Sequence, residues 1–296
     1  MALVLSVLEQ GLIYAVMALG VYITYKILDF PDLTVDGSFP FGAAVTAVLI
    51  DKGCPPLLTL LLTFLAGGII GIVTGLIHVK LKVRDLLSGI IMMTALYTVN
   101  LRITGRANYP IYTKGTIFNN SLLSSIVPEA VQPYQTVLIC IIIVIAVKLL
   151  LDLYLKTKSG FLLRAVGDNP SLLTTLAVDK GFVKIVGLAI ANGLVALSGC
   201  IFAQQQRFFD ISVGTGTVVI GLASVIIGTS LCKLGRKPWM KVTTSVVIGS
   251  ILYKGCVGLA VSFGFAASDM KLITAILFLL ILVVTMDRKR GRKADA

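Results

Sequence analysis

The chain carries a succession of long apolar segments, and this pattern constrains its fold more than any other feature. A helix rises 1.5 Å per residue, so about 20 apolar residues cross the hydrocarbon core of a bilayer. The approximate segments are 3–25, 38–50, 56–79, 86–104, 134–155, 182–205, 212–232, 239–258 and 269–286. The sequence therefore predicts an all-α integral membrane protein, a polytopic bundle of about 8 to 10 transmembrane helices.

Composition agrees with a chain whose solvent is mostly lipid. Hydrophobic residues make up 57% of the 296 residues and charged residues only 14%, which is unusual for a water-soluble domain. The first basic residue, Lys26, follows the first apolar run, so the basic start of a removable secretion signal is missing. We expect one transmembrane domain, residues 1–286, followed by a basic cytoplasmic tail, 287–296.

Basic residues predict the orientation of the chain. Most of the 26 Lys and Arg residues fall in intervals that would share one side of the membrane with the carboxyl end, such as 80–84, 156–184, 233–241 and 288–293. The positive-inside rule places these intervals in the cytoplasm and the amino end outside. The formal charge of +12 then reflects attraction to anionic lipid headgroups, and no nucleic-acid partner is needed to explain it.

Two short motifs interrupt apolar segments in a similar way. Asp32-Leu33-Thr34-Val35 precedes one Gly-rich helix, and Asp210-Ile211-Ser212-Val213 precedes another. In the predicted topology these helices run in opposite directions, which is typical of an inverted internal repeat with broken helices. The half-repeats would cover about 1–155 and 181–286, joined by a cytoplasmic coupling loop, 156–180. Broken backbone is tolerated at membrane depth only where it lines a cavity or is buried in protein.

Residues near these breaks are the candidates for a solute path. They are Thr34, Asp36, Phe39, Phe41, Met92, Asn100, Asn192 and Ser212. An amide inside a span must find partners, so Asn100 and Asn192 are either ties between helices or solute contacts. Phe39, Phe41, Met92 and Met93 form an apolar constriction or simply pack. An intramembrane carboxylate usually marks a pathway or a paired charge; we expect Asp36 near the path and Asp29 at the cytoplasmic rim.

Two further patterns indicate packing and docking. Gly67, Gly71 and Gly75 recur every fourth residue, so one face of this helix lets another backbone approach, within the subunit or across a dimer. In the polar interval 156–184, Asn169 and Pro170 resemble an N-cap and a first helical residue. The predicted helix, about 170–177, is too short to span a bilayer. Its leucine face would dock on another protein: Leu172, Leu173 and Leu176.

The sequence offers no recognisable catalytic centre. It contains no Gly-Lys dipeptide and therefore no phosphate-binding loop of the Walker type. His78 is the only histidine, and the five cysteines show no C-x-x-C spacing, so no metal site is expected. We expect a non-catalytic subunit that binds no cofactor itself.

Three stretches carry a resemblance to a known family. They are 28–47 with its Gly-Ser-Phe-Pro-Phe-Gly-Ala run, 159–170, and 187–228 with Ala-Leu-Ser-Gly at 196–199. The chain resembles the permease subunit of an ATP-binding-cassette (ABC) importer, in the branch of branched-chain amino-acid and ribose permeases. It looks closest to a single-permease subgroup linked to aromatic or other amino acids.

The resemblance implies a homodimeric pore in a bacterial cell membrane, two cytoplasmic ATP-binding subunits that use ATP and Mg²⁺, and an extracytoplasmic substrate-binding protein. It also implies that the loop contacts the ATPase through Gly160, Arg164, Asp168, Asn169, Pro170, Leu172, Leu173 and Leu176. The interval 106–133 would meet the binding protein. The chain departs from the branched-chain pattern at Asp29, Asp32 and Asp36, which leaves the solute open.

An ion-coupled secondary transporter is the alternative. In it, Asp32 and Asp36 would bind a proton or sodium and no ATPase would exist. Inverted repeats and broken helices suit this alternative equally well. The amphipathic cytoplasmic helix favours the ATP-driven importer, because a carrier has less use for it.

Overall fold

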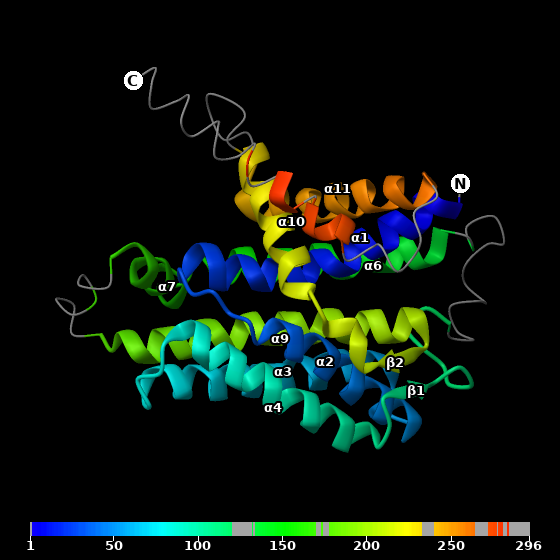
Figure 1. Ribbon diagram of the computed structural model, residues 1–296, viewed down its shortest axis with the longest axis horizontal. Helices are drawn as coiled ribbons and strands as arrows, with labels where there is room; N and C mark the ends of the chain where they lie inside the picture. Colours follow the sequence, from blue (N-terminus) through cyan, green and yellow to red (C-terminus); the bar gives the residue numbers. More distant parts are fainter. Residues whose placement is uncertain are drawn as a thin grey trace.

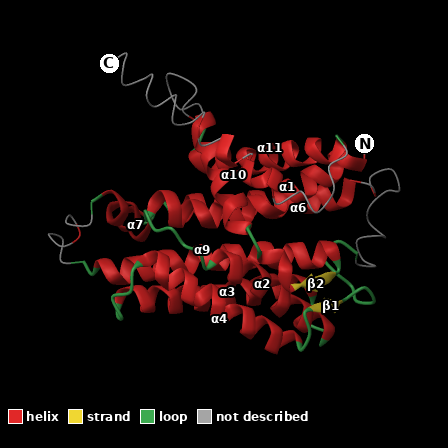
Figure 2. Cartoon of the chain, in the orientation of Figure 1, coloured by secondary structure: helices red, strands yellow, loops and turns green. Residues whose placement is uncertain are grey.

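The computed structural model describes residues 2–119, 132, 134–169, 173, 178–232, 240–263, 272–276, 278–280 and 283. Helices dominate these residues (Figure 2). The long helices are α1 (Ala2–Val21), α2 (Val35–Asp51), α3 (Pro56–Val79), α4 (Asp85–Thr104), α6 (Gln135–Tyr154), α7 (Lys158–Asp168), α9 (Lys180–Gln206), α10 (Thr217–Cys232) and α11 (Val242–Ser262). The shorter elements are the π-helix η1 (Tyr22–Ile27), the 3₁₀-helix η3 (Ile211–Gly214) and strands β1 (Asn108–Pro110) and β2 (Phe208–Asp210).

Seven helical segments of the described residues are long and apolar enough to cross a membrane. They coincide with seven of the predicted apolar segments to within a few residues. The helix α2 corresponds to an eighth segment and is 17 residues long. The prediction of an all-α polytopic membrane protein is confirmed. The ninth predicted segment, 269–286, lies largely outside the described residues.

Most of the long helices run side by side in two layers (Figure 1). One layer holds α1, α6 and α11, the other holds α2, α3, α4 and α9, and α10 runs across this direction. The helix α9 contacts α1, α2 and α3 and is the most deeply buried of the spans. It is therefore the central helix around which both layers assemble.

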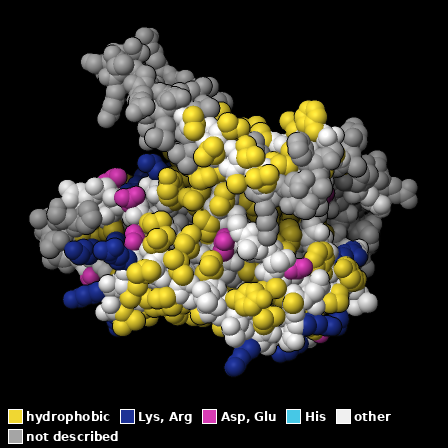
Figure 3. Space-filling model, in the orientation of Figure 1, with side chains coloured by type: hydrophobic (Ala, Val, Ile, Leu, Met, Phe, Trp, Pro, Cys, Tyr) yellow, Lys and Arg dark blue, Asp and Glu magenta, His cyan; other side chains and the backbone are white. Residues whose placement is uncertain are grey.

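One face of α3 that other helices leave exposed is apolar, as expected for a lipid contact. Leu57, Leu61, Leu65 and Ile69 recur every fourth residue and are all exposed. In a water-soluble protein such a stripe would be an interaction surface, but here it is what a bilayer requires. In Figure 3, hydrophobic side chains cover the middle of the visible face, and Lys and Arg gather toward its edges.

The opposite face of α3 carries the glycine repeat, and it packs within the subunit. A Cβ added at Gly71 would lie 2.1 Å from the carbonyl oxygen of Leu188, and one added at Gly67 would lie 2.7 Å from that of Asn192. Gly75 meets Ile185 in the same way. The three glycines thus let the backbone of α3 approach that of α9 closely. The sequence left open whether this glycine face packs within the subunit or across a dimer, and in the structure it packs within the subunit.

Candidate functional site

Asp32 stabilises the non-helical segment between η1 and α2. Its side chain is only 5% exposed. Oδ1 accepts a hydrogen bond of 2.9 Å from the backbone N–H of Thr34, and Oδ2 accepts one of 2.8 Å from Nδ2 of Asn192. A buried carboxylate is tolerated when donors surround it, so these bonds stabilise the non-helical turn at this depth.

Asn192 joins the central helix α9 to this break. Its side chain is completely buried. Its Oδ1 accepts a hydrogen bond of 2.7 Å from Oγ of Ser38, while Nδ2 donates to Asp32 and, at 3.2 Å, to the carbonyl oxygen of Leu188. The sequence left open whether Asn192 links helices or contacts the solute. These hydrogen bonds link α9 to the first break and to α2.

Asp36 caps the amino end of α10. Its carboxylate accepts hydrogen bonds from the backbone N–H groups of Gly216 (3.1 Å) and Val218 (2.7 Å) and from Oγ1 of Thr217 (2.9 Å). The first N–H groups of a helix have no partner inside it, and its dipole favours a negative charge there. A residue of the first broken helix therefore completes the second one.

The second break is built like the first. Oδ1 of Asp210 accepts a hydrogen bond of 2.7 Å from the backbone N–H of Ser212, as Asp32 does from Thr34. Ser212 itself is exposed. Just before this turn, β2 pairs antiparallel with β1, with Asp210 opposite Asn108. Two segments far apart in sequence thus share one local geometry.

Asn100 of α4 and Thr34, the residue before α2, connect the start of α2 to α4 and α3. Nδ2 of Asn100 donates a long hydrogen bond of 3.4 Å to the carbonyl oxygen of Gly37, and its buried Oδ1 accepts none within the described residues. Thr34 is completely buried, and its hydroxyl lies 3.3 Å from that of Thr74 on α3. Asn100 is therefore the predicted path residue with spare hydrogen-bonding capacity.

Phe39 packs in one buried cluster and Phe41 and Met92 in another, which is the packing alternative that the sequence left open. Phe39 is completely buried and stacks on Tyr14 of α1, with ring centroids 5.5 Å apart and an interplanar angle of 14°. Phe41 and Met92 belong to a separate buried cluster with Leu96 of α4. The reason is helical geometry: residues two apart on α2 point in different directions.

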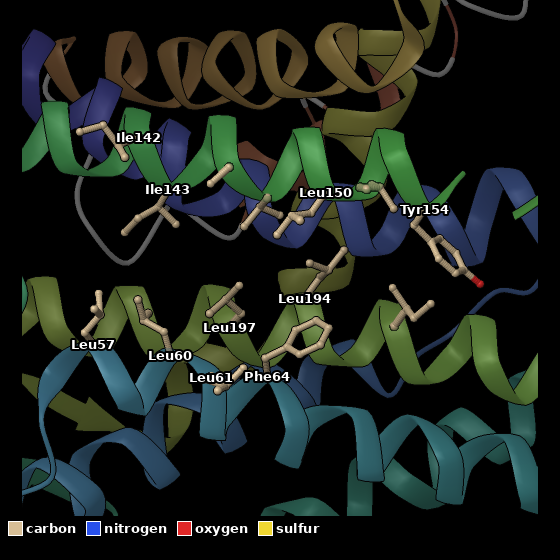
Figure 4. A pocket seen from close by; sticks show the side chains of 14 residues that line it. Leu57, Leu60, Leu61, Phe64, Ile142, Ile143, Leu150, Tyr154, Leu194 and Leu197 are labelled. Atoms are coloured by element: carbon tan, nitrogen blue, oxygen red, sulfur yellow. The ribbon is translucent and has the colours of Figure 1, made fainter. Parts of the chain in front are cut away.

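An apolar groove of about 610 Å³ lies between α6 on one side and α3 and α9 on the other (Figure 4). Leu57, Phe64, Ile142, Leu150 and Leu197 are among the side chains that line it. The hydroxyl of Tyr154 supplies the polar side-chain atom of its lining. A polar solute would lose its hydration there without gaining partners, so the groove is not the predicted path.

The segment predicted to couple to an ATPase begins with a helix, α7, that sequence reasoning did not identify. The hydroxyl of Thr157 caps it by accepting a bond from the N–H of Gly160. Gly160 lies against the backbone of Leu155, where a Cβ would come within 2.5 Å. Three exposed residues share the outer face of α7 at helical spacing: Phe161, Arg164 and Asp168.

The predicted leucine face is corrected in part. Leu173 is completely buried and belongs to the main hydrophobic cluster of this chain, so its side chain does not face a partner. Apolar surface is buried wherever the same chain can cover it. Pro170, Leu172 and Leu176 lie outside the described residues. Asn169 is the C-terminal cap of α7, and the helix predicted after it, about 170–177, lies almost entirely outside the described residues.

Sequence reasoning also missed a charged cluster around Asp152 of α6. Its Oδ2 pairs with Nζ of Lys148 at 3.2 Å and with Nζ of Lys241 at 3.3 Å. Its Oδ1 accepts a hydrogen bond of 2.7 Å from Thr243 of α11. The i,i+4 spacing of Lys148 and Asp152 was a readable signal, but the partners Lys241 and Thr243, at the start of α11, are visible only in the fold.

At the other end of α2, Asp51 contacts the loop that follows α4. Oδ2 of Asp51 accepts a hydrogen bond of 2.7 Å from the hydroxyl of Tyr109, and Oδ1 lies 3.5 Å from Nζ of Lys114. The hydrogen bond from Tyr109 is the main cause that lowers the pKa of Asp51, and the same bond raises the pKa of Tyr109. This exposed triad fixes the start of the interval 106–133.

The chain is similar to known proteins over nearly its whole length. Residues 3–286 match the family described as branched-chain amino acid transport system / permease component. The chain is 42% identical to a tyrosine transport system permease protein of Clostridioides difficile over 93% of this chain and 89% of that protein. It is 26% identical to a ribose import permease protein of Haemophilus influenzae over 77% and 69% of the two chains.

A probable branched-chain amino acid transport permease protein of Methanocaldococcus jannaschii is also 26% identical, over 72% of this chain and 70% of its own. No solved structure matches the chain. The matched residues include both breaks, α7 and all seven candidate spans. This multi-pass membrane protein is the permease component of an ABC-type transport system, and it belongs to the family of branched-chain amino acid transport permeases.

Proposed function

We propose that the chain is the solute-conducting subunit of an ATP-driven importer of amino acids in the bacterial inner membrane. The similarity to a tyrosine transport system permease, 42% over 93% of the chain, carries this proposal. The amino end lies outside and the carboxyl end in the cytoplasm. Two copies form the pore, and the chain binds no cofactor and catalyses no reaction itself. Two partner ATPases use ATP and Mg²⁺, and an extracytoplasmic protein delivers the solute.

The ATPases dock on the outer face of α7. Phe161 is 61% exposed and shares the outer face of α7 with Arg164, and an exposed aromatic side chain next to a guanidinium is the composition of a protein-binding surface. Arg164 and Asp168 add charges for orientation. Gly160 fixes α7 closely against Leu155 at the end of α6, so a push on α7 is transmitted to that span.

Transport follows alternating access between two related halves, about 1–155 and 181–286. The matching Asp turns at Thr34 and Ser212 support this division. Asp36 couples the halves, because it lies on α2 and caps α10. Rotation of one half against the other would therefore strain the hydrogen bonds between Asp36 and the amino end of α10.

The carboxylates of both breaks favour this mechanism over coupling to sodium. Asp32 and Asp36 accept hydrogen bonds from protein donors on both oxygens. A cation site needs several free oxygen ligands. The role of these carboxylates is therefore to stabilise the broken helices by hydrogen bonding.

The function is tested by purifying the chain from its native membrane together with the ATPase that accompanies it, adding the binding protein, and measuring uptake of labelled tyrosine, leucine and ribose into proteoliposomes. We expect uptake of an amino acid that requires ATP and the binding protein. Uptake that continues without ATP and collapses with an ionophore would instead establish the secondary transporter.

Coupling is tested separately with Phe161→Asp. We expect the variant to assemble in the membrane and to lose at least about tenfold of ATP-driven uptake, because a charge in a buried contact is strongly unfavourable. Lys80→Glu is the control, since this residue is exposed in the predicted cytoplasmic interval 80–84, outside the coupling loop. Equal uptake by both variants and the unmodified chain would exclude α7 as the docking element.

A further inference from the structure

The exposed side of α4 changes character along its length. This helix lies at the edge of its layer (Figure 1). Exposed residues recur on it at every fourth position: Leu86, Ile90, Thr94, Thr98 and Arg102. The first two are apolar and the last three are polar, and the change falls at the middle of the helix. The stripe with the same spacing on α3 is apolar throughout, so the two exposed faces suit different surroundings.

The polar part of this stripe has hydrogen-bonding groups that the chain does not use. The hydroxyl of Thr94 donates a bond of 2.9 Å to the carbonyl oxygen of Ile90. The hydroxyls of Thr98 and of Tyr97, which lies beside the stripe and is 55% exposed, have no partner within the described residues. In hydrocarbon these groups would lose their hydration and gain nothing. Polar residues inside a span almost always face protein or water.

The second break lies at the level of this polar part. Gly37 of α2 lies between Met93 and Asn100 of α4: a Cβ added to it would lie 3.2 Å from Cα of Met93, and Nδ2 of Asn100 donates to its carbonyl oxygen. The neighbouring residue, Asp36, binds the first N–H groups of α10. In addition, η3 contacts α4 directly. The second break is therefore beside the middle of a span, at membrane depth.

This break is not covered by the described part of the chain. Ser212 and Thr215 are both exposed, and the backbone between β2 and α10 is a 3₁₀-turn and not an α-helix. Irregular backbone is tolerated inside a membrane only where it is buried in protein or lines a water-filled space. Because these two residues are exposed, burial within one copy does not meet this condition. The face that they share with α4 must border water.

We propose that the polar part of α4 and the second break form one wall of a water-filled half of the solute path that opens to the outside. This inference rests on the proposed function and its orientation, in which α4 runs outward from the cytoplasmic interval 80–84. Water enters along α4 from Arg102 as far as Thr94, and the apolar inner half with Leu86 and Ile90 stops it. The hydroxyl groups of the wall exchange hydrogen bonds with a small polar solute.

A second copy of the chain forms the opposite wall. The described residues of one chain leave this face open, and a water-filled path must be enclosed against lipid. Two identical chains related by a two-fold axis bring the same face of each together. An axis beside α4 therefore encloses the path without a further protein, and the path is incomplete in one copy.

Modification of single cysteines by a water-soluble thiol reagent tests the path. Cys54 and Cys256 are first replaced by serine, because the other cysteines are buried. Thr98→Cys is then compared with Ile90→Cys, on the inner half of the same stripe, and with Ile69→Cys, on the apolar stripe of α3. The reagent is a charged methanethiosulfonate that does not cross membranes, added to right-side-out membrane vesicles without ATP.

We expect Thr98→Cys to react at least about tenfold faster than either control, because the reactive thiolate forms in water and not in hydrocarbon. Thr215→Cys should react like Thr98→Cys, since the second break shares the wall. Equal rates for Thr98→Cys and Ile69→Cys would overturn the path. The substituted side chains are exposed, and the thermal midpoint checks folding; Thr94→Cys replaces Thr98→Cys if that variant does not fold.

A flexible bismaleimide tests the second copy. It should link Thr98→Cys into a covalent dimer and leave Ile69→Cys as a monomer, both read from the mass of the denatured protein. If Thr98→Cys reacts with the charged reagent but gives no dimer, the second copy is not the opposite wall. Equal dimer formation by both variants would also overturn this assignment, because it would reflect random collision.

Failure of the path and failure of the proposed function give different results, since cysteine modification needs neither ATP nor solute. If the modification pattern is found but ATP drives no amino-acid uptake, only the proposed function falls. If ATP-driven amino-acid uptake occurs but Thr98→Cys reacts no faster than Ile69→Cys, only the path falls.

Discussion

The carboxylate of Asp36 accepts a hydrogen bond of 2.7 Å from the backbone N–H of Val218, although the two residues belong to different broken helices. This contact joins the first turn of α2 to the first turn of α10. It satisfies backbone donors that would otherwise be unpaired near the middle of the protein. The relationship makes Asp36 a structural fastener between the two breaks.

Asp36→Ala should therefore destabilise the protein by about 1–3 kcal/mol, because it leaves the first N–H groups of α10 without their acceptor. The thermal midpoint of the purified chain measures this effect. Asp29→Asn is the matched control: Asp29 is exposed and has a positive φ of 51°, which Asn tolerates. Equal midpoints for the two variants would contradict the capping role.

Asn192→Ala should be more damaging than Asn100→Ala. The first change removes bonds to Asp32, Ser38 and Leu188 and leaves a buried carboxylate short of a donor, at about 1.5–3 kcal/mol for that bond alone. The second removes one bond of 3.4 Å. The midpoints of chemical unfolding in detergent measure the stability of the two variants. A lower midpoint for Asn100→Ala than for Asn192→Ala would refute the role of Asn192 as a link between helices.

Gly71→Ala should destabilise the protein by about 1–3 kcal/mol, because the added Cβ would lie 2.1 Å from a carbonyl oxygen of α9. Gly68→Ala is the matched control on the same helix. Its Cβ would lie 3.6 Å from the nearest atom, an ordinary contact, and alanine favours a helix by about 1 kcal/mol over glycine. Thermal unfolding should separate the two, and equal losses would disprove the α3–α9 seam.

Tyr109→Phe should raise the pKa of Asp51 toward its usual value, because the hydroxyl of Tyr109 is the main cause of its lowering. A lowered folded-state pKa means that this contact is favourable above the unfolded pKa and is lost as pH falls through the folded value. The ¹³C shift of the Asp51 carboxyl, assigned with Asp51→Asn, follows the titration. An unchanged pKa would refute the hydrogen bond.

The succession of long apolar segments alone determined the fold class and the bounds of most spans. An uninterrupted run of about 20 apolar residues in lipid has few alternatives to a helix, since every backbone N–H and C=O must be paired internally. The two Asp motifs likewise predicted where helices are interrupted, and the structure has a turn at each. These features are local, so local sequence contains them.

Only the tertiary structure decided which residues meet. The cap that Asp36 provides to α10, the tie made by Asn192, the burial of Leu173 and the separation of Phe39 from Phe41 depend on how helices pack across the chain. Side-chain periodicity gives the direction of a residue on its own helix but not the neighbour that it faces. Contacts between distant segments arise from the packing of all helices together, and this is the part that the sequence pattern does not contain.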